Sequence, residues 1–395
     1  MSVSPDPGAS AAIPHRVTQC DIARAAGVHN TTVSLALRNS PTIPETTRKR
    51  IQSLAQEMGY HRDPALQALV AYRKGRAAGD RRDTIAYVTN GYTRRGWQNL
   101  PADALFYAGA LRKAAQLGYQ IEHFWLGEPG MTAKRLSNVL FHRGINGVLL
   151  ASHPASSDAL AEFDWSRVSA VKIGCFPEGP ALHRVLDDDH GAIRLAMRKA
   201  LEAGYQRIGL VLPKAWDDAA AQEISATFFA EQNRILPQHR LPVFFCEAPD
   251  AEGRAVAQDS ENLQLWLRRN RPQAILSSHR LLGGTLSELG VSIPHDLGFI
   301  DVFAAELEPR MAGVRRNCQR VGEVAAELLA GLIQQNTFGP AEVPTVTAVE
   351  GCWCEGDSLP AIGVNSSAAH SERIVLHASV RADGVARDAC ALRAG

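Results

Sequence analysis

The sequence predicts an α/β fold, with a small three-helix head, a joining segment and two doubly wound α/β lobes. Residues 15–82 contain short amphipathic stretches at helical spacing. From Thr84 onward, apolar runs of strand length alternate with helical stretches, as they do in sheets with βαβ crossovers. The length of 395 residues is sufficient for two or three compact units.

Composition is that of an ordinary globular chain and excludes several other classes. The sequence contains no run of about 18 apolar residues, the length that a helix needs to span a membrane. The start is rich in serine, proline and alanine but lacks the basic and apolar regions of a secretory signal, so we expect a cytoplasmic protein. The seven cysteines are an odd number spread over a long chain, which predicts reduced thiols and not a disulfide framework.

The formal net charge of +1 conceals an uneven distribution of charge. Residues 15–82 carry 12 Lys or Arg against 5 Asp or Glu, whereas residues 83–395 carry 30 against 35. A small basic module is typical of nucleic-acid binding, because lysine and arginine displace the counterions condensed on phosphates. On charge alone, a solvated basic surface is an equal alternative.

The head has the spacing of a helix-turn-helix. Thr18 and Asp21 form a capping-box-like start for a first helix that Gly27 ends. A second short helix is expected over 30–38, and a third amphipathic helix over 44–58. Three small helices joined by this tight turn predict a DNA-reading unit.

The stretch Arg16–Leu69 resembles the DNA-binding head of the lactose/galactose repressor family. The resemblance is continuous and includes the GVHNTTVS core, the ETTR start of the third helix and the GY that ends it. It implies that the second helix enters the major groove. The residues it implies at the DNA are Thr18, His29, Asn30, Thr31, Thr32, Ser34, Leu35, Arg38, Arg48, Tyr60, Ala68 and Leu69.

The family's pattern divides these residues by role. It implies that Asn30, Thr31 and Leu35 read base edges, whereas Thr32 and Ser34 contact phosphates. Leu35 departs from the family, which usually has an arginine there to reach guanine, so the operator sequence is not transferable. Plain helix capping and a solvated face are the alternative for the polar residues, and His29 or Asn30 can cap the second helix.

Residues 64–82 join the head to the body. Pro64 can start a short helix, and glycines and basic residues after it indicate flexible chain. In the family, the matching segment is a hinge helix that forms on DNA and inserts a leucine into the minor groove. The resemblance puts Leu69 at that position, next to Ala68. The alternative is that Leu66 and Leu69 only cover the body.

The body contains two series of continuous apolar runs, as expected for buried parallel strands. The runs lie at 84–90, 118–126, 145–152, 168–174, 207–213, 241–248, 273–278 and 296–303. Two such lobes leave a cleft at the carboxyl ends of their strands, where small ligands bind. No G-x-G-x-x-G or P-loop is present, so nucleotide chemistry has no support.

From about residue 84 to 360 the body resembles the effector domain of the same family, which is itself similar to periplasmic sugar-binding proteins. The expected organisation is a disordered tail (1–15), the helix-turn-helix domain (16–63), the hinge and linker (64–82), the two-lobed domain (83–360) and a disordered tail (361–395). Within the body we expect an N-lobe of 83–187 and 312–335 and a C-lobe of 188–311 and 336–360.

Five residues are candidates for the effector pocket: Asn90, Glu223, Ser278, Phe303 and Arg316. Several depart from the sugar-binding pattern, because Glu223 stands where the family often has an arginine and Phe303 where it has an aspartate. A simple hexose is therefore a poor fit, and the effector, carbohydrate-derived or not, stays unknown. Each candidate could equally be a core or rim residue.

No catalytic or metal-binding constellation is recognisable. Asp187, Asp188 and Asp189 lack the ligand spacing of a metal site, and helix capping at a crossover explains them better. The histidines come without a G-x-S-x-G nucleophile elbow. We therefore expect no enzyme activity, no metal and no cofactor.

These observations predict a sequence-specific transcriptional regulator, a repressor that binds a pseudopalindromic double-stranded operator as a homodimer. A small-molecule effector between the lobes would control it. A cytoplasmic solute-binding module without DNA function stays open, and so does a regulator with a protein effector or none. An α/β enzyme is the third class, which turnover on a sugar or nucleotide would favour.

Overall fold

The computed structural model describes residues 17–37, 40, 42–60, 83–91, 93–151, 160–174, 179–247 and 257–362. The chain forms two compact units, which are described separately: residues 1–82 with 332–337, and residues 83–331 with 338–395. The expectations for the N-terminal tail, Arg38, the hinge with Ala68 and Leu69, and the chain beyond Ile362 lie outside the described residues. No described helix is long and apolar enough to cross a membrane.

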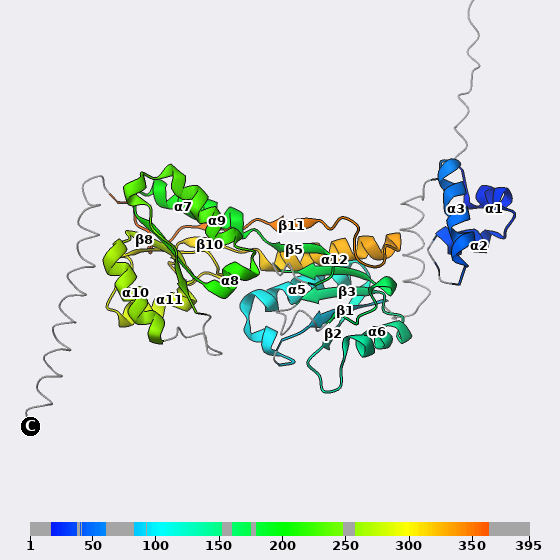
Figure 1. The fold of residues 1–395 in the computed structure, drawn as a ribbon, viewed down its shortest axis with the longest axis horizontal. Coiled ribbons are helices and arrows are strands. Elements are labelled where there is room, and N and C mark those ends of the chain that lie inside the picture. Colours follow the sequence, from blue (N-terminus) through cyan, green and yellow to red (C-terminus); the bar gives the residue numbers. More distant parts are fainter. Residues whose placement is uncertain are drawn as a thin grey trace, which may run out of the picture. The chain divides into compact units, whose positions relative to one another are not determined.

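The head contains the three expected helices (Figure 1): α1 (Gln19–Ala26), α2 (Asn30–Leu37) and α3 (Glu45–Glu57). Thr18 caps α1 in a complete capping box with Asp21, and Gly27 ends the helix at φ +66°, a conformation that favours glycine. Six side chains form the buried core of the head: Ile22, Ala23, Val33, Ala36, Ile51 and Ala55.

The N-lobe contains a six-stranded sheet in the order β11-β5-β4-β3-β1-β2, and all its described pairs are parallel. The strands are β1 (Asp83–Thr89), β2 (Tyr119–Trp125), β3 (Gly147–Ala151), β4 (Ser169–Ile173), β5 (His183–Asp187) and β11 (Val346–Val349). The helices are α5 (Pro101–Gln116), α6 (Ala133–His142) and α12 (Cys318–Gln335), with short 3-10 turns at Gly96–Asn99 and Trp165–Arg167.

The C-lobe contains a second six-stranded sheet, in the order β12-β10-β9-β8-β6-β7, with β12 antiparallel to β10. The strands are β6 (Ile208–Pro213), β7 (Phe244–Cys246), β8 (Ala274–Ser277), β9 (Gly298–Asp301), β10 (Gly313–Arg315) and β12 (Cys352–Cys354). The helices are α7 (Asp189–Glu202), α8 (Lys214–Ala219), α9 (Glu223–Glu231), α10 (Ala257–Asn270) and α11 (His279–Glu288), with 3-10 turns at Gln232–Arg234 and Pro237–His239.

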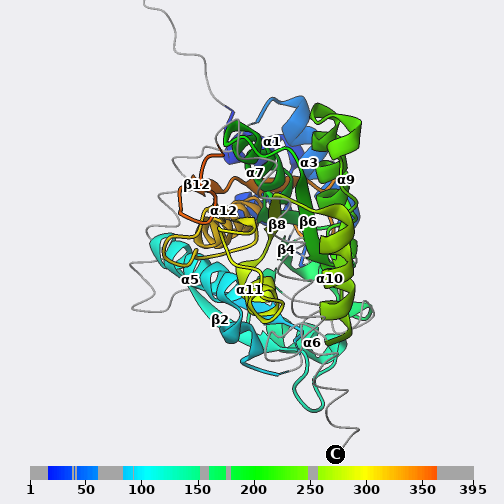
Figure 2. The same ribbon diagram turned by 90° about the vertical axis from the view of Figure 1, so that its left-hand side faces the viewer.

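Helices cover both faces of the C-lobe sheet, as its fully buried strands β6, β8 and β9 require. Side chains of α7 and α9 form one buried cluster with the sheet, and side chains of α10 and α11 form another on the opposite face (Figure 2). The fold class predicted from the alternating apolar runs is confirmed, since all eight runs contain a strand of one of the two sheets.

The two later crossings between the lobes differ from the sequence-based boundaries. β10 pairs in the C-lobe sheet although residues from 312 onward were assigned to the N-lobe, and β11 pairs in the N-lobe sheet although residues from 336 were assigned to the C-lobe. Both strands are short, and β10 lies beside β9 whereas β11 lies beside β5. Neither has the long apolar run from which the other strands were predicted. The chain thus crosses between the sheets after β5, after β10 and after β11.

Candidate nucleic-acid interface and effector cleft

The second helix of the helix-turn-helix, α2, is held in place by a cap and by one apolar face. His29 Nδ1 accepts the backbone N–H of Thr31 at 3.3 Å and lies 2.9 Å from the Thr31 hydroxyl. Val33 and Ala36 are fully buried between α1 and α3. Asn30 and Thr31 are exposed at the start of the helix, the part that contacts base edges in this motif.

Several of the predicted DNA-contacting residues also hold the head together. Thr18 caps α1, and His29 caps α2 as one of the alternatives foresaw. The Tyr60 hydroxyl accepts Gln19 Nε2 at 3.1 Å, and Arg48 Nη1 donates to the carbonyl oxygen of Ser40 at 3.3 Å. Their contacts with DNA stay predictions, as do those of Thr32 and Ser34.

Among the described residues of the head, the basic side chains lie on α1 and α3, and most of them pair within the head. Arg24 pairs with Asp21 at 3.3 Å, and Lys49 pairs with Glu45 at 2.7 Å. Arg50 donates to the carbonyl oxygen of Ala26 at 3.1 Å. Exposed ion pairs of this kind contribute little to stability, so these cations can exchange their partners for phosphates.

In the C-lobe, Phe303 and Arg316 lie together where strands end at their carboxyl ends. The Arg316 guanidinium lies over the Phe303 ring, 5.3 Å from its centroid, and Trp216 meets the same ring edge-on at 5.6 Å. Arg316 also forms an ion pair with Asp189, the first residue of α7. Sequence reasoning did not single out Trp216 and interpreted Asp189 only as part of a helix cap.

The loops after β8 and β9 are fixed by one buried carboxylate. Asp301 accepts the backbone N–H groups of His279 at 2.9 Å and of Phe303 at 3.0 Å. Burial raises the pKa of Asp301 above its usual value, while these hydrogen bonds oppose the rise. Ser278, at the N-cap of α11, is thereby held near Phe303.

The other two pocket candidates lie elsewhere in the body. Asn90 is buried directly after β1 in the N-lobe. Glu223 is exposed at the start of α9, where its carbonyl oxygen accepts the Thr227 hydroxyl at 2.6 Å. Asn90 and Glu223 thus lie on other elements than Trp216, Phe303 and Arg316.

Asp187 is an unusual buried acid at the first crossing between the lobes. The Cys318 thiol donates to its Oδ2 at 3.7 Å, whereas its Oδ1 is buried without a hydrogen-bond partner. Burial raises the pKa of Asp187 from 3.8 to about 6, although the charge of Arg316 acts in the opposite direction. At neutral pH the body therefore holds a carboxylate that is poorly compensated.

We expect the Asp187→Asn variant to be more stable than the original protein at pH 7.5, by about 1–3 kcal/mol. A folded-state pKa above the unfolded value means that the stability of the original protein falls as the pH rises from about 4 to about 6. The gain should therefore shrink as the pH is lowered from 7.5 towards 4. Urea denaturation at several pH values measures it.

The matched control is Asp188→Asn, because Asp188 caps α7 through the N–H of Gly191 at 2.7 Å and asparagine caps equally well. A change in stability of the same size at pH 7.5 and pH 4 in Asp187→Asn would contradict the burial argument.

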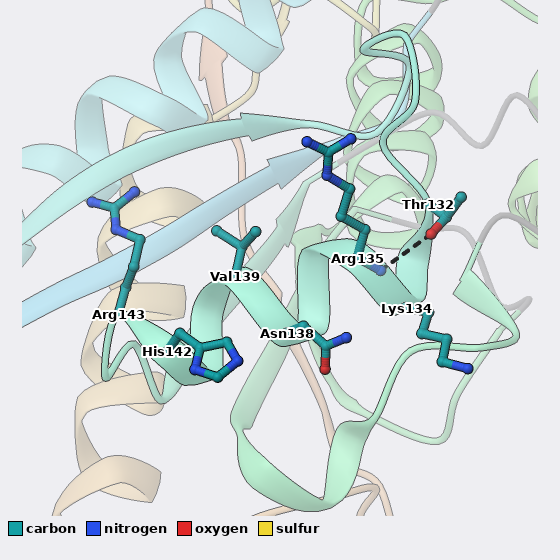
Figure 3. A pocket seen from close by; sticks show the side chains of 7 residues that line it. All are labelled: Thr132, Lys134, Arg135, Asn138, Val139, His142 and Arg143. Atoms are coloured by element: carbon teal, nitrogen blue, oxygen red, sulfur yellow. Dashed lines mark hydrogen bonds between the residues drawn. The ribbon is translucent and has the colours of Figure 1, made fainter.

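Two surface hollows lie away from the five pocket candidates. The larger, of about 510 Å³, lies over α6, and Figure 3 shows the residues that line it: Thr132, Lys134, Arg135, Asn138, Val139, His142 and Arg143. Arg143 is already paired with Glu122 at 2.6 Å, and Arg135 Nη1 donates to the Gly130 carbonyl oxygen at 3.0 Å. The second, of about 330 Å³, lies between α7 and α9, where Arg194 and Arg234 share Glu231.

The described part of the chain contains neither a candidate metal site nor a disulfide bond. No cluster of three or more His, Cys, Asp or Glu side chains that could hold a metal ion is present among the described residues. Asp188 serves as the helix cap that the sequence indicated. The described cysteines are free thiols: Cys20, Cys246, Cys318, Cys352 and Cys354.

Family models match both parts of the chain. Residues 18–63 match the model of bacterial regulatory proteins of the lacI family, and residues 197–359 match the model of a periplasmic binding protein-like domain.

Curated relatives extend these matches over most of the chain. The transcriptional regulator GalS of Salmonella typhimurium is 27% identical over 79% of this chain and 88% of its own length. The probable repressor ExuR of Bacillus subtilis is 23% identical over 81% and 92%, and the regulator CelR of Thermobifida fusca is 25% identical over 82% and 93%.

Solved structures show the same fold. A complex of the transcriptional regulator CelR with cellobiose aligns with a TM-score of 0.54 at 21% identity, covering 87% of this chain and 100% of the other. The lac repressor dimer bound to operator and the anti-inducer ONPF aligns with a TM-score of 0.51 at 17% identity, covering 88% and 100%.

Proposed function

The chain belongs to the lacI family of bacterial regulatory proteins and is a DNA-binding transcriptional regulator, not an enzyme, and from this premise we propose how it acts. It works in the cytoplasm as a homodimeric repressor on a pseudopalindromic operator, and a small molecule bound between the lobes controls it. The observation that carries the proposal is α2, a capped helix whose first residues, Asn30 and Thr31, are exposed.

Two heads are needed because one offers few base contacts. An operator with twofold symmetry lets a symmetric dimer double its readout. A stripe of apolar residues along α5 supports this dimer: Leu100, Ala104, Ala108, Leu111 and Ala115 follow one another at helical spacing. Leu100 and Leu111 are 44% and 43% exposed, and covering such side chains stabilises an interface.

The effector site that we propose is the cluster of Trp216, Phe303 and Arg316. Its two aromatic rings offer apolar surface, and Arg316 offers a fixed charge. The ion pair of Arg316 with Asp189 joins two of the crossings between the lobes, because Arg316 follows β10 and Asp189 follows β5. A ligand that competes for either partner changes how these crossings are held, and this gives it different affinities for two arrangements of the lobes.

Selection of bound sequences from random double-stranded DNA by the full-length protein tests this function. We expect one preferred sequence with twofold symmetry and an affinity that falls with rising salt. Recovery of no preferred sequence would contradict the proposal and favour a solute-binding module. Mapping the bound sites on the chromosome then identifies the regulated genes, whose products indicate the chemistry of the effector.

A further inference from the structure

Within α2, Leu35 stands apart from the other large apolar side chains. Val33 and Ala36 are buried in the core of the head, and Leu37 packs against the same cluster. Leu35 is only partly buried and is not one of the side chains that pack on this core. A partly exposed leucine outside the core, on the helix that enters the major groove, indicates an apolar contact outside the head.

Thr31 lies one helical turn before Leu35, so the two side chains share a face of α2. Thr31 is exposed, but its hydroxyl lies 2.9 Å from His29 Nδ1 and is engaged there. Its methyl group is therefore the part that stays free for DNA. On a helix of 3.6 residues per turn, the face with Thr31 and Leu35 lies opposite the buried face with Val33 and Ala36.

The same helix has no charged side chain with which to read guanine. Its sequence from Asn30 to Leu37 is NTTVSLAL. The usual contact with guanine is a two-pronged hydrogen bond from arginine or lysine to O6 and N7. A leucine placed over a G·C pair would instead leave polar base atoms without a partner and without water, which is unfavourable.

We propose that α2 reads its half-site through the C5-methyl groups of thymines. This methyl is the apolar group that a base pair presents in the major groove, and a ridge formed by the Thr31 methyl and Leu35 is complementary to it. Asn30, exposed as the first residue of α2, can pair with the adenine of a neighbouring T·A pair. The base pairs that Asn30, Thr31 and Leu35 contact are therefore A·T pairs. This inference rests on the proposed function and specifies the class of operator.

The test replaces individual thymines of the selected operator with deoxyuridine, which removes the methyl and keeps the base pair. With the full-length protein at fixed salt, we expect about fourfold weaker binding for each critical methyl in one half-site and about 15-fold when both half-sites are changed. Thymines outside the region under α2 serve as the control within the same DNA, and their replacement should leave the affinity unchanged.

Two variants locate the effect on the protein. Leu35→Ala should bind the thymine operator more weakly than the original protein does. Replacing the thymine that Leu35 contacts with deoxyuridine should then weaken the binding of this variant no further. Thr31→Ser keeps the hydroxyl that His29 engages and removes only the methyl group. In this variant, deoxyuridine in place of the thymine that Thr31 contacts should no longer weaken binding. That thymine is a different one from the thymine that Leu35 contacts. Ser53→Ala, an exposed change on α3, is the matched control and should keep both penalties.

The outcomes separate this inference from the proposed function. If selection recovers a symmetric operator but uracil leaves the affinity unchanged at every thymine, the methyl readout is wrong while the regulator stands. A uracil penalty that persists unchanged in both Leu35→Ala and Thr31→Ser also overturns it. If selection recovers no preferred sequence, the proposed function itself fails.

Discussion

Replacement of Gly322 by valine is expected to lower the free energy of unfolding of the body by about 3 kcal/mol or more. A Cβ at Gly322 on α12 would overlap the carbonyl oxygen of Phe106 and lie 2.8 Å from the amide nitrogen of Ala110. Both are backbone atoms of α5, so no side-chain rotation can relieve the overlap. Gly109 of α5 meets the backbone of Gln319 in the same way, and the two glycines together let the helix backbones touch.

Gly331→Ala is the matched control on the same helix, because nothing lies within 4 Å of a Cβ placed there. Alanine in place of glycine inside a helix should leave stability unchanged or raise it by about 1 kcal/mol. Urea denaturation followed by tryptophan fluorescence measures both variants, since all six tryptophans lie in the body. Unfolding of Gly322→Val at the same urea concentration as the original protein would show that α5 and α12 are not in close contact.

The close crossing of α5 and α12 also shows where sequence-based reasoning ends. Gly322 lies within α12, and its local sequence gives no sign of the helix that it contacts. Gly109 and Gly322 are far apart in the sequence, and only the folded backbone shows that each faces the other helix. Glycine is unfavourable inside a helix, so its presence there indicates that another segment packs closely against it. The sequence does not identify that segment.

The head was predictable almost completely because its signals are local. The capping box needs only Thr18 and Asp21, three residues apart, and the left-handed turn needs only Gly27. The strands missed in the body lack such signals. β5 has only two apolar residues, Val185 and Leu186, and β10 and β12 have three residues each, so neither the length nor the apolar run of a typical buried strand is present.

Prediction of the candidate effector site was partial for a similar reason. Phe303 and Arg316 were both candidates for the pocket, and the structure brings them into contact. Their other partners come from distant segments, Trp216 from α8 and Asp189 from the start of α7. These segments come together only at the crossings between the lobes. Which of their side chains pair therefore depends on the fold and could not be predicted from a single sequence.

Replacement of Leu111 by glutamate is expected to convert the protein to a monomer and to weaken operator binding by about a hundredfold or more, because the two half-sites would no longer be bound by one linked pair of heads. If the α5 stripe is the twofold interface, each partner would bury a carboxylate near its symmetry mate, where desolvation and like-charge repulsion both oppose association. Leu111 is 43% exposed, so the fold of the single chain should tolerate the change.

Sedimentation velocity and operator binding at the same salt concentration check this expectation, and Leu265→Glu is the matched control. Leu265 is 62% exposed on α10 of the C-lobe, so the same substitution there introduces the same charge outside the proposed interface. Persistence of the dimer in Leu111→Glu would place the interface elsewhere. If the original protein binds a symmetric operator as a monomer, the proposed homodimer is wrong. The twofold symmetry of the DNA would then have no counterpart in the protein.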